Sequence, residues 1–87
     1  MVERPWVTSP SYASAVTVIV AARKAQGLSQ RDLADRLGKP RSFVSKVESR
    51  ERRLDVVEFI AMARALGADP LQLLALVIEA LPGELTF

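Results

Sequence analysis

The segment GLSQRDLADRLGKPRSFVSKVE, from Gly27 to Glu48, constrains the fold of this chain more than any other. It holds two short amphipathic helical patterns, separated only by Gly38, Lys39 and Pro40. A connection this short is too tight for an antiparallel helical hairpin, and it suits two helices that meet at a steep angle. The glycine suits the left-handed residue after a helix, and the proline suits the first turn of the next helix.

The first pattern carries its own start signal. Ser29 can accept a backbone hydrogen bond as an N-cap, and Asp32 follows at the capping-box position. The apolar face that comes next consists of Leu33, Ala34 and Leu37. The sequence therefore predicts a short helix between Ser29 and Gly38.

The second pattern separates an apolar face from a polar one. At about 100° per residue, the apolar face holds Phe43, Val44 and Val47. The other face carries cations and hydroxyls and no acid, from Arg41, Ser42, Ser45, Lys46 and Ser49. A solvated helix face usually mixes both signs of charge, and this face does not. The pattern therefore favours the second helix of a helix-turn-helix, which enters the major groove of DNA.

Composition narrows the possible chemistry. The 87 residues suit one small domain, and they include no cysteine and no histidine. The commonest general base is therefore missing, and only carboxylates remain as common metal ligands. We predict no catalytic residue, no metal site and no cofactor. The remaining enzymatic alternative is a nucleophile made by Ser42 and Lys46, one helical turn apart, but no pattern around them predicts a pocket.

The chain shows no signal for membrane insertion or export. Its N-terminal residues MVERPWVTSP lack the apolar core of a signal peptide. No apolar run approaches the roughly 20 residues that a membrane helix needs. We therefore expect a cytoplasmic protein with no membrane partner, and the absence of cysteine suits a reducing compartment.

Charge divides the chain into a basic and an acidic part. Residues 1–53 carry 11 Lys and Arg against 5 acids (11 − 5 = +6), and residues 54–87 carry 1 against 5 (1 − 5 = −4). The basic part either faces a polyanion or is simply a solvated surface. The first interpretation is favoured because a basic loop follows the second helix, with Arg50, Arg52 and Arg53 placed to meet phosphates beside the groove.

The remaining segments predict an arm, three further helices and a tail. Residues 1–10 form the arm, residues 11–81 the domain and residues 82–87 the tail. Residues 11–26 combine a β-branched run, typical of a strand, with helical spacing and end signals, and we interpret them as a helix. Asp55 and Asp69 can serve as N-caps of two more helices.

The last of these helices, at residues 70–81, is apolar nearly all round. Such a helix must be buried on more than one side. We therefore predict that it packs against a second copy of the chain, through an interface formed by Leu73, Leu76, Val77 and Ala80. The alternative is that the arm or the tail folds over it.

Residues 22–74 closely resemble the lambda-repressor-like helix-turn-helix domains, the Xre/Cro family of bacterial and phage regulators. GLSQ, LA, LG, SKVE and ALG stand in the family's order and spacing. The resemblance implies an all-α fold of five helices, in which the second and third form the helix-turn-helix. It also implies a bacterial or phage-type protein that associates with the nucleoid when bound.

The resemblance also implies roles for single residues. Gln30 is similar to a glutamine that contacts both phosphate and the first base-reading side chain, and Arg23 and Glu48 match an ion pair between the first and third helices. Base edges would be read by Arg41, Ser42 and Lys46, with Ser45 beside them. Arg53 matches a phosphate-contacting basic position of the family. Apart from the resemblance, the place of the other residues beside the motif leads us to expect phosphate contacts from the full set Ser29, Gln30, Lys39, Arg50, Arg52 and Arg53.

Two residues depart from the family's pattern. Arg50 stands where glycine is usual, at the exit from the third helix, and a left-handed backbone there would cost arginine about 1 kcal/mol. Ser42 stands where longer amides are common, and its short side chain weakens base reading at that position.

These observations lead to one main hypothesis and one alternative. The main hypothesis is a sequence-specific regulator of transcription, a repressor, that binds an inverted-repeat operator in double-stranded DNA as a homodimer. The alternative is an antitoxin-like or adaptor subunit whose last helix binds a different protein, with DNA binding secondary. The sequence does not name that protein partner.

Overall fold

In the computed structural model of the protein, which describes residues 9–87, five α-helices follow one another and these residues form no strand. Their bounds are α1 Pro10–Ala25, α2 Gln30–Leu37, α3 Arg41–Glu48, α4 Val56–Ala65 and α5 Pro70–Ala80. The all-α prediction is therefore confirmed. Residues 1–8 of the predicted arm lie outside the described residues, and Pro10, assigned to the arm, is the first residue of α1.

Helix α1 resolves the conflict between strand and helix signals in its sequence. The Ser9 side chain accepts the backbone N–H of Tyr12, and Pro10 occupies the first turn, as its fixed φ allows. Val16 and Ile19 are buried on the inner side. Burial of that face outweighs the local preference of β-branched residues for a strand, which is small and depends on context.

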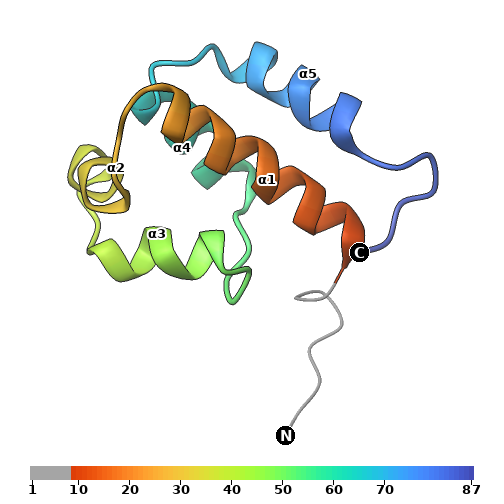
Figure 1. The fold of residues 1–87 in the computed structure, drawn as a ribbon, viewed down its shortest axis with the longest axis horizontal. Helices are drawn as coiled ribbons and strands as arrows, with labels where there is room; N and C mark the ends of the chain where they lie inside the picture. The colour runs from red at the N-terminus through yellow and green to blue at the C-terminus, as the bar shows by residue number, and fades with distance from the viewer. Residues whose placement is uncertain (1–8) are drawn as a thin grey trace, which may run out of the picture.

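Helix α1 crosses the middle of the molecule and packs against α5 and α3 (Figure 1). Helix α5 lies along one side of α1 and α3 lies on the other. Helix α2 lies at the left-hand end, next to α3, and α4 lies behind α1, in contact with α2 and α5 (Figure 1). The core joins all five helices and includes Ile19, Leu33, Val44, Val47, Met62, Leu66 and Leu73. The helix-turn-helix is thus one wall of the core.

The C-terminal tail returns to the start of α1 (Figure 1). The Ser9 hydroxyl donates to the Thr86 carbonyl over 2.6 Å, and the Thr86 N–H donates to the Ser11 hydroxyl over 2.8 Å. Leu85 and Phe87 remain exposed. The tail therefore closes the N-terminal end of α1 and does not provide the apolar cover for α5 that the sequence left open as an alternative.

Helix α5 buries two of the four residues that were predicted to contact a second chain. Leu73 and Val77 are only 2% and 7% exposed, because they pack inward where α5 lies on α1 and α4. Their own domain therefore buries most of both side chains, and their contact with a second chain stays a prediction. The strongly exposed apolar side chains of α5 are those of Leu71, Leu74, Leu76 and Ile78.

Among residues 9–87, no single helix has the length and apolar character to cross a membrane, although α4 and α5 together, bent by 112°, meet both criteria.

The turn after α3 has the left-handed residue that the resemblance implied. Arg50 has φ +68°. Its N–H donates to the Val47 carbonyl over 3.1 Å, and the Glu51 N–H donates to the Lys46 carbonyl over 2.9 Å. This pair of bonds is the Schellman arrangement, which strongly prefers glycine at its left-handed position. The left-handed turn of the family is therefore kept, and Arg50 adopts it at a cost in conformational free energy that glycine would not have.

We predict that Arg50→Gly raises the free energy of unfolding by about 1 kcal/mol, because glycine adopts positive φ without a steric cost. For a domain of this size the midpoint Tm should rise by roughly 4–8 °C in thermal unfolding. Ser49→Gly is the matched control. Ser49 has φ −83°, so glycine there should lower the Tm. An unchanged or lower Tm in Arg50→Gly would mean that the arginine side chain compensates for the strain.

Candidate nucleic-acid interface

The ends of α2 and the start of α3 are formed by the capping, glycine and proline residues that the sequence indicated. The Asp32 N–H donates to the Ser29 hydroxyl over 3.0 Å, and the Ser29 N–H donates to the Asp32 carboxylate over 2.9 Å. This capping box is the predicted one. Gly38 ends α2 with φ +67°, and Pro40 precedes α3 in an extended conformation. The N-cap of α2 and its glycine end therefore match the signals in the sequence.

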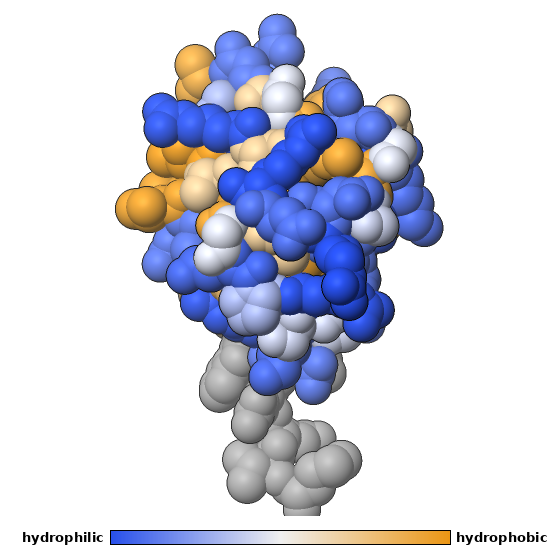
Figure 2. All heavy atoms as spheres, turned by 90° about the vertical axis from the view of Figure 1, so that its left-hand side faces the viewer, coloured by the Kyte–Doolittle hydropathy of each residue, from blue (hydrophilic) through white to orange (hydrophobic). Residues whose placement is uncertain are grey.

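Helix α3 presents a polar outer face. Arg41, Ser42 and Lys46 are exposed, and Ser45 is half-buried. Val44 and Val47 are fully buried on the opposite side, as predicted. Figure 2 views the molecule from the side on which α2 lies, and hydrophilic side chains cover most of the lower part of this face, with hydrophobic ones above them.

The hydroxyl of Ser45 has an internal partner. It donates to the Ser42 carbonyl over 3.2 Å, one turn earlier in α3. A serine that donates its only proton within the helix retains acceptor capacity alone. In this conformation Ser45 can accept a hydrogen bond from an exposed group but cannot donate one.

The predicted ion pair between Arg23 and Glu48 is present and nearly buried. Arg23 Nε and Nη2 donate to the two oxygens of Glu48 over 2.6 and 2.9 Å, and the side chains are only 10% and 8% exposed. Arg23 Nη1 also donates to the Leu28 carbonyl over 2.7 Å. The hydrogen bonds to Glu48 raise the pKa of Arg23 above its ordinary value, so this guanidinium stays charged.

Gln30 joins this pair with a contact that the sequence did not indicate. Its side-chain amide donates to Glu48 Oε1 over 2.9 Å. Gln30 therefore links the start of α2 to the end of α3, and Arg23 adds α1 to the same network. The hypothesis had the Gln30 side chain shared between phosphate and the first base-reading residue, whereas here one of its N–H groups is taken by Glu48.

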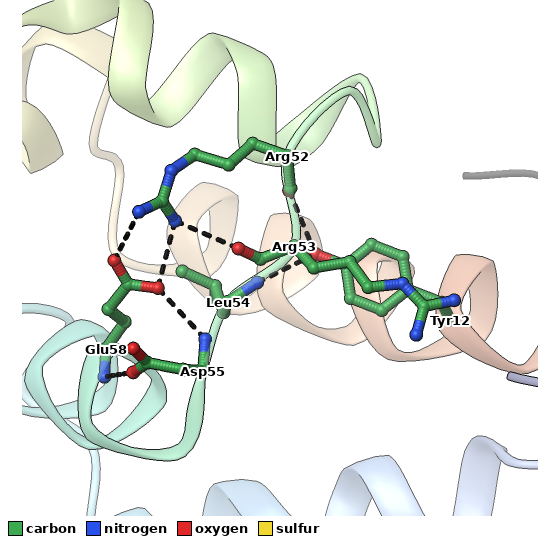
Figure 3. Close-up of polar contacts among 6 residues, drawn as sticks. All are labelled: Tyr12, Arg52, Arg53, Leu54, Asp55 and Glu58. Atoms are coloured by element: carbon green, nitrogen blue, oxygen red, sulfur yellow. Dashed lines mark hydrogen bonds and ion pairs between the residues drawn. The ribbon is translucent and has the colours of Figure 1, made fainter. Parts of the chain in front are cut away.

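Arg52 bends back onto α4 (Figure 3). Its Nη1 and Nη2 donate to the two oxygens of Glu58 over 2.9 and 2.6 Å, and its guanidinium lies 4.7 Å from the centre of the Phe43 ring. Glu58 also accepts the Asp55 N–H, within the capping box of α4. The guanidinium of Arg52 therefore pairs with a carboxylate of its own domain while its side chain stays 43% exposed, and its contact with phosphate stays a prediction.

The other predicted phosphate residues surround the outer face of α3. Ser29, Lys39 and Arg50 are exposed. Arg53 is half-buried, and its guanidinium lies 4.7 Å from the centre of the Tyr12 ring. Among residues 9–87, no group of three or more His, Cys, Asp and Glu side chains is arranged to hold a metal ion.

The arrangement of α2 and α3 defines a helix-turn-helix protein. The helix-turn-helix family model matches residues 19–73. An XRE-family like protein from Pseudomonas syringae pv. tomato str. DC3000 is 46% identical, with 83% of this chain and 88% of that chain covered and a TM-score of 0.76. The chain therefore belongs to the lambda-repressor-like, or XRE, family of helix-turn-helix regulators.

Two restriction-modification controller proteins have similar structures. C.AhdI from Aeromonas hydrophila is 34% identical, with 71% of this chain and 94% of that chain covered and a TM-score of 0.65. The C.Esp1396I tetramer, solved in complex with its natural 35 base-pair operator, is 22% identical, with 83% and 95% covered and a TM-score of 0.76. At that identity the second likeness concerns the fold alone. No curated protein sequence matches this chain.

We predict that Glu58 makes stability depend on pH in the acid range. Hydrogen bonds from Arg52, and then from the Asp55 N–H, lower the pKa of Glu58 from 4.5 to about 2. A lowered folded-state pKa stabilises the domain above pH 4.5, and the stabilisation is lost as the pH falls from 4.5 towards 2. Glu58→Gln should therefore be less stable than wild type at neutral pH, and the difference should shrink over that interval.

Chemical denaturation at a series of pH values measures this difference. Glutamine keeps the capping geometry of α4, so the comparison isolates the carboxylate. Arg52→Leu removes the other partner and should show the same convergence with wild type. A stability difference that stays constant down to pH 2 would contradict the assigned role of the Arg52–Glu58 pair.

Proposed function

We propose that this protein is a sequence-specific regulator of transcription that binds double-stranded DNA. The observation that carries the proposal is the outer face of α3, where Arg41, Ser42 and Lys46 are exposed. Among the described residues of α3 the only acid is Glu48, and Arg23 holds it inside the domain. A helix of this kind fits a major groove.

Base reading is assigned to four residues of α3. Arg41 and Lys46 can donate to O6 and N7 of guanine, and each good contact contributes about 1–3 kcal/mol of discrimination. Ser42 reaches less far. Ser45, whose proton is used within the helix, suits the amino group of adenine or cytosine in the same groove. The middle of the half-site should therefore be read less strictly than the positions facing Arg41 and Lys46.

Phosphate contacts are assigned to the rim of this face. Ser29 and Gln30 bring the N-terminus of α2, which attracts anions, to the DNA backbone. Lys39, Arg50 and Arg53 add positive charge around α3. Such contacts fix the register of the protein on DNA without reading its sequence. Arg52 is left out of this set because it binds Glu58.

A homodimer is proposed from the apolar surface beside α5. A hollow between α1, α4 and α5 is lined almost wholly by apolar side chains, among them Ile19, Val56, Phe59, Leu71 and Leu74. Val56 and Leu71 are also strongly exposed. A contiguous apolar surface of this kind marks an interaction site. We assign the dimer contact to this surface, which Val77 of the predicted interface also lines, whereas Leu73 belongs to the core. Leu76 and Ala80, also exposed, lie on another flank of α5.

A two-fold dimer implies an inverted-repeat operator with half-sites about one helical turn apart. A dimer bound to such an operator would repress transcription by excluding RNA polymerase. We expect it to act in the cytoplasm, where the bacterial chromosome lies. The second candidate, an antitoxin-like or adaptor subunit, is favoured by Leu76, Leu85 and Phe87, which are exposed outside the hollow. Light scattering separates the two, because the second candidate predicts a monomer until another protein is added.

Selection of bound duplexes from a random DNA pool tests the proposed function. We expect enrichment of an inverted repeat, which gives the operator, its spacing and its symmetry together. Failure to enrich any sequence would contradict the assignment of base reading to α3. An enriched sequence without symmetry would contradict the dimer only.

We predict different effects from two arginine substitutions. Arg41→Ala should relax the base preference at one position of each half-site, at a cost of about 1–3 kcal/mol for the preferred base. Arg53→Ala should weaken binding to all sequences alike and should flatten its salt dependence. Competition binding with operator variants at several salt concentrations measures both. A uniform loss in both variants would show that the division into reading and positioning residues is wrong.

We predict that Leu74→Asp produces a monomer with much weaker operator binding, because it places a charge in the hollow. Leu76→Asp is the matched control, with the same substitution in the same helix on a different flank, and it should remain a dimer. Light scattering and gel shifts give the two readouts. Dimers in Leu74→Asp together with monomers in Leu76→Asp would move the interface to the flank that the sequence pattern indicated.

A further inference from the structure

Tyr12 occupies a position in the arginine loop that the sequence did not single out. Its hydroxyl donates to the Arg52 carbonyl over 3.2 Å and accepts the Leu54 N–H over 3.3 Å. Its ring lies beneath the guanidinium of Arg53, 4.7 Å from ring centre to guanidinium carbon. Figure 3 shows all of these residues, with Tyr12 reaching the loop from α1.

These contacts hold Arg53 from both sides. The residues before and after it are bonded through their backbones to one hydroxyl, so the backbone of Arg53 is fixed between two anchors. The tyrosine ring then fixes the direction of the side chain. Burial raises the pKa of Tyr12 above its ordinary value of 10.0, so the hydroxyl keeps the proton that it donates to Arg52.

The side chains of the adjacent Arg52 and Arg53 therefore point in different directions. Arg52 turns towards α4 and binds Glu58, whereas Arg53 turns towards α1 and covers Tyr12 (Figure 3). A guanidinium over a ring contacts it through its flat face, and its N–H groups lie in the plane of that face. The ring can therefore orient the Arg53 guanidinium through contacts that do not use its N–H groups.

We propose that Tyr12 is a positioning residue that presents Arg53 to a phosphate of the DNA backbone. The inference rests on the proposed function, and it adds a residue of α1 to the binding machinery. An arginine already held in one rotamer loses less conformational entropy when it binds phosphate. Tyr12 thus acts on DNA only through Arg53, and this separates it from residues that support the fold as a whole.

A double-mutant cycle tests this dependence with mixed-sequence double-stranded DNA at low salt as the probe. Tyr12→Leu removes the ring and the hydroxyl, and we expect binding about two- to fivefold weaker. In an Arg53→Ala background the same substitution should cause no further loss. Tyr12→Phe keeps the ring and loses the hydroxyl, so it should give a smaller loss that also disappears in that background.

Each outcome of the cycle is decisive. Tyr12 also lines the apolar hollow, so an effect through dimerisation or folding would persist without Arg53. Equal losses in both backgrounds would therefore overturn the positioning role, as would unchanged binding in Tyr12→Leu. If thermal unfolding shows that Tyr12→Leu does not fold, the cycle with Tyr12→Phe decides by the same criterion. A wild-type chain that fails to bind this DNA would overturn the proposed function as well.

Discussion

The buried ion pair between Arg23 and Glu48 is the interaction on which the arrangement of the helix-turn-helix depends. Glu48 ends α3, and it receives Arg23 from α1 and Gln30 from the start of α2. Charges removed from water are costly unless they are paired and fully hydrogen-bonded, and here both conditions are met. Loss of either partner would leave a buried charge uncompensated, which costs about 3–5 kcal/mol in such pairs. The three helices are thereby held in one geometry.

A second polar cluster, around Arg52 and Glu58, fixes the loop that follows α3. The first cluster is nearly buried, whereas the side chains of the second are 43% and 25% exposed, so solvent weakens the second. The second cluster therefore orients the arginine side chains of the loop more than it stabilises the fold. Arg52 covers Phe43 at the edge of the core and leaves the neighbouring Arg53 to Tyr12. Two arginines of this basic loop, Arg52 and Arg53, are thus placed by contacts with Glu58, Phe43 and Tyr12.

The features that the sequence predicted are those with local signals. Capping boxes at Ser29 and Asp55, the glycine turn at Gly38 and the apolar face of α3 all follow from spacing within a few residues. The Arg23–Glu48 pair was found through the family resemblance. Two of the four residues predicted for the outward face of α5, Leu73 and Val77, are buried, because a helix apolar on both sides does not reveal which side meets α1. The ion pair between Arg52 and Glu58 was not predicted, because charge alone does not show that Glu58 lies opposite. Tyr12 was missed because its contacts join residues about forty positions apart.

Helix α1 connects the two surfaces that the proposed function requires. Arg23, near its C-terminal end, holds Glu48 of the base-reading helix, and Tyr12, near its start, holds the arginine loop. Between them, Ile19 belongs both to the core and to the lining of the apolar hollow. If a second copy covers that hollow, α1 is the rigid element that sets the distance from the two-fold axis to α3. The spacing of operator half-sites is then a property of packing against α1, and α3 determines only which bases are read there.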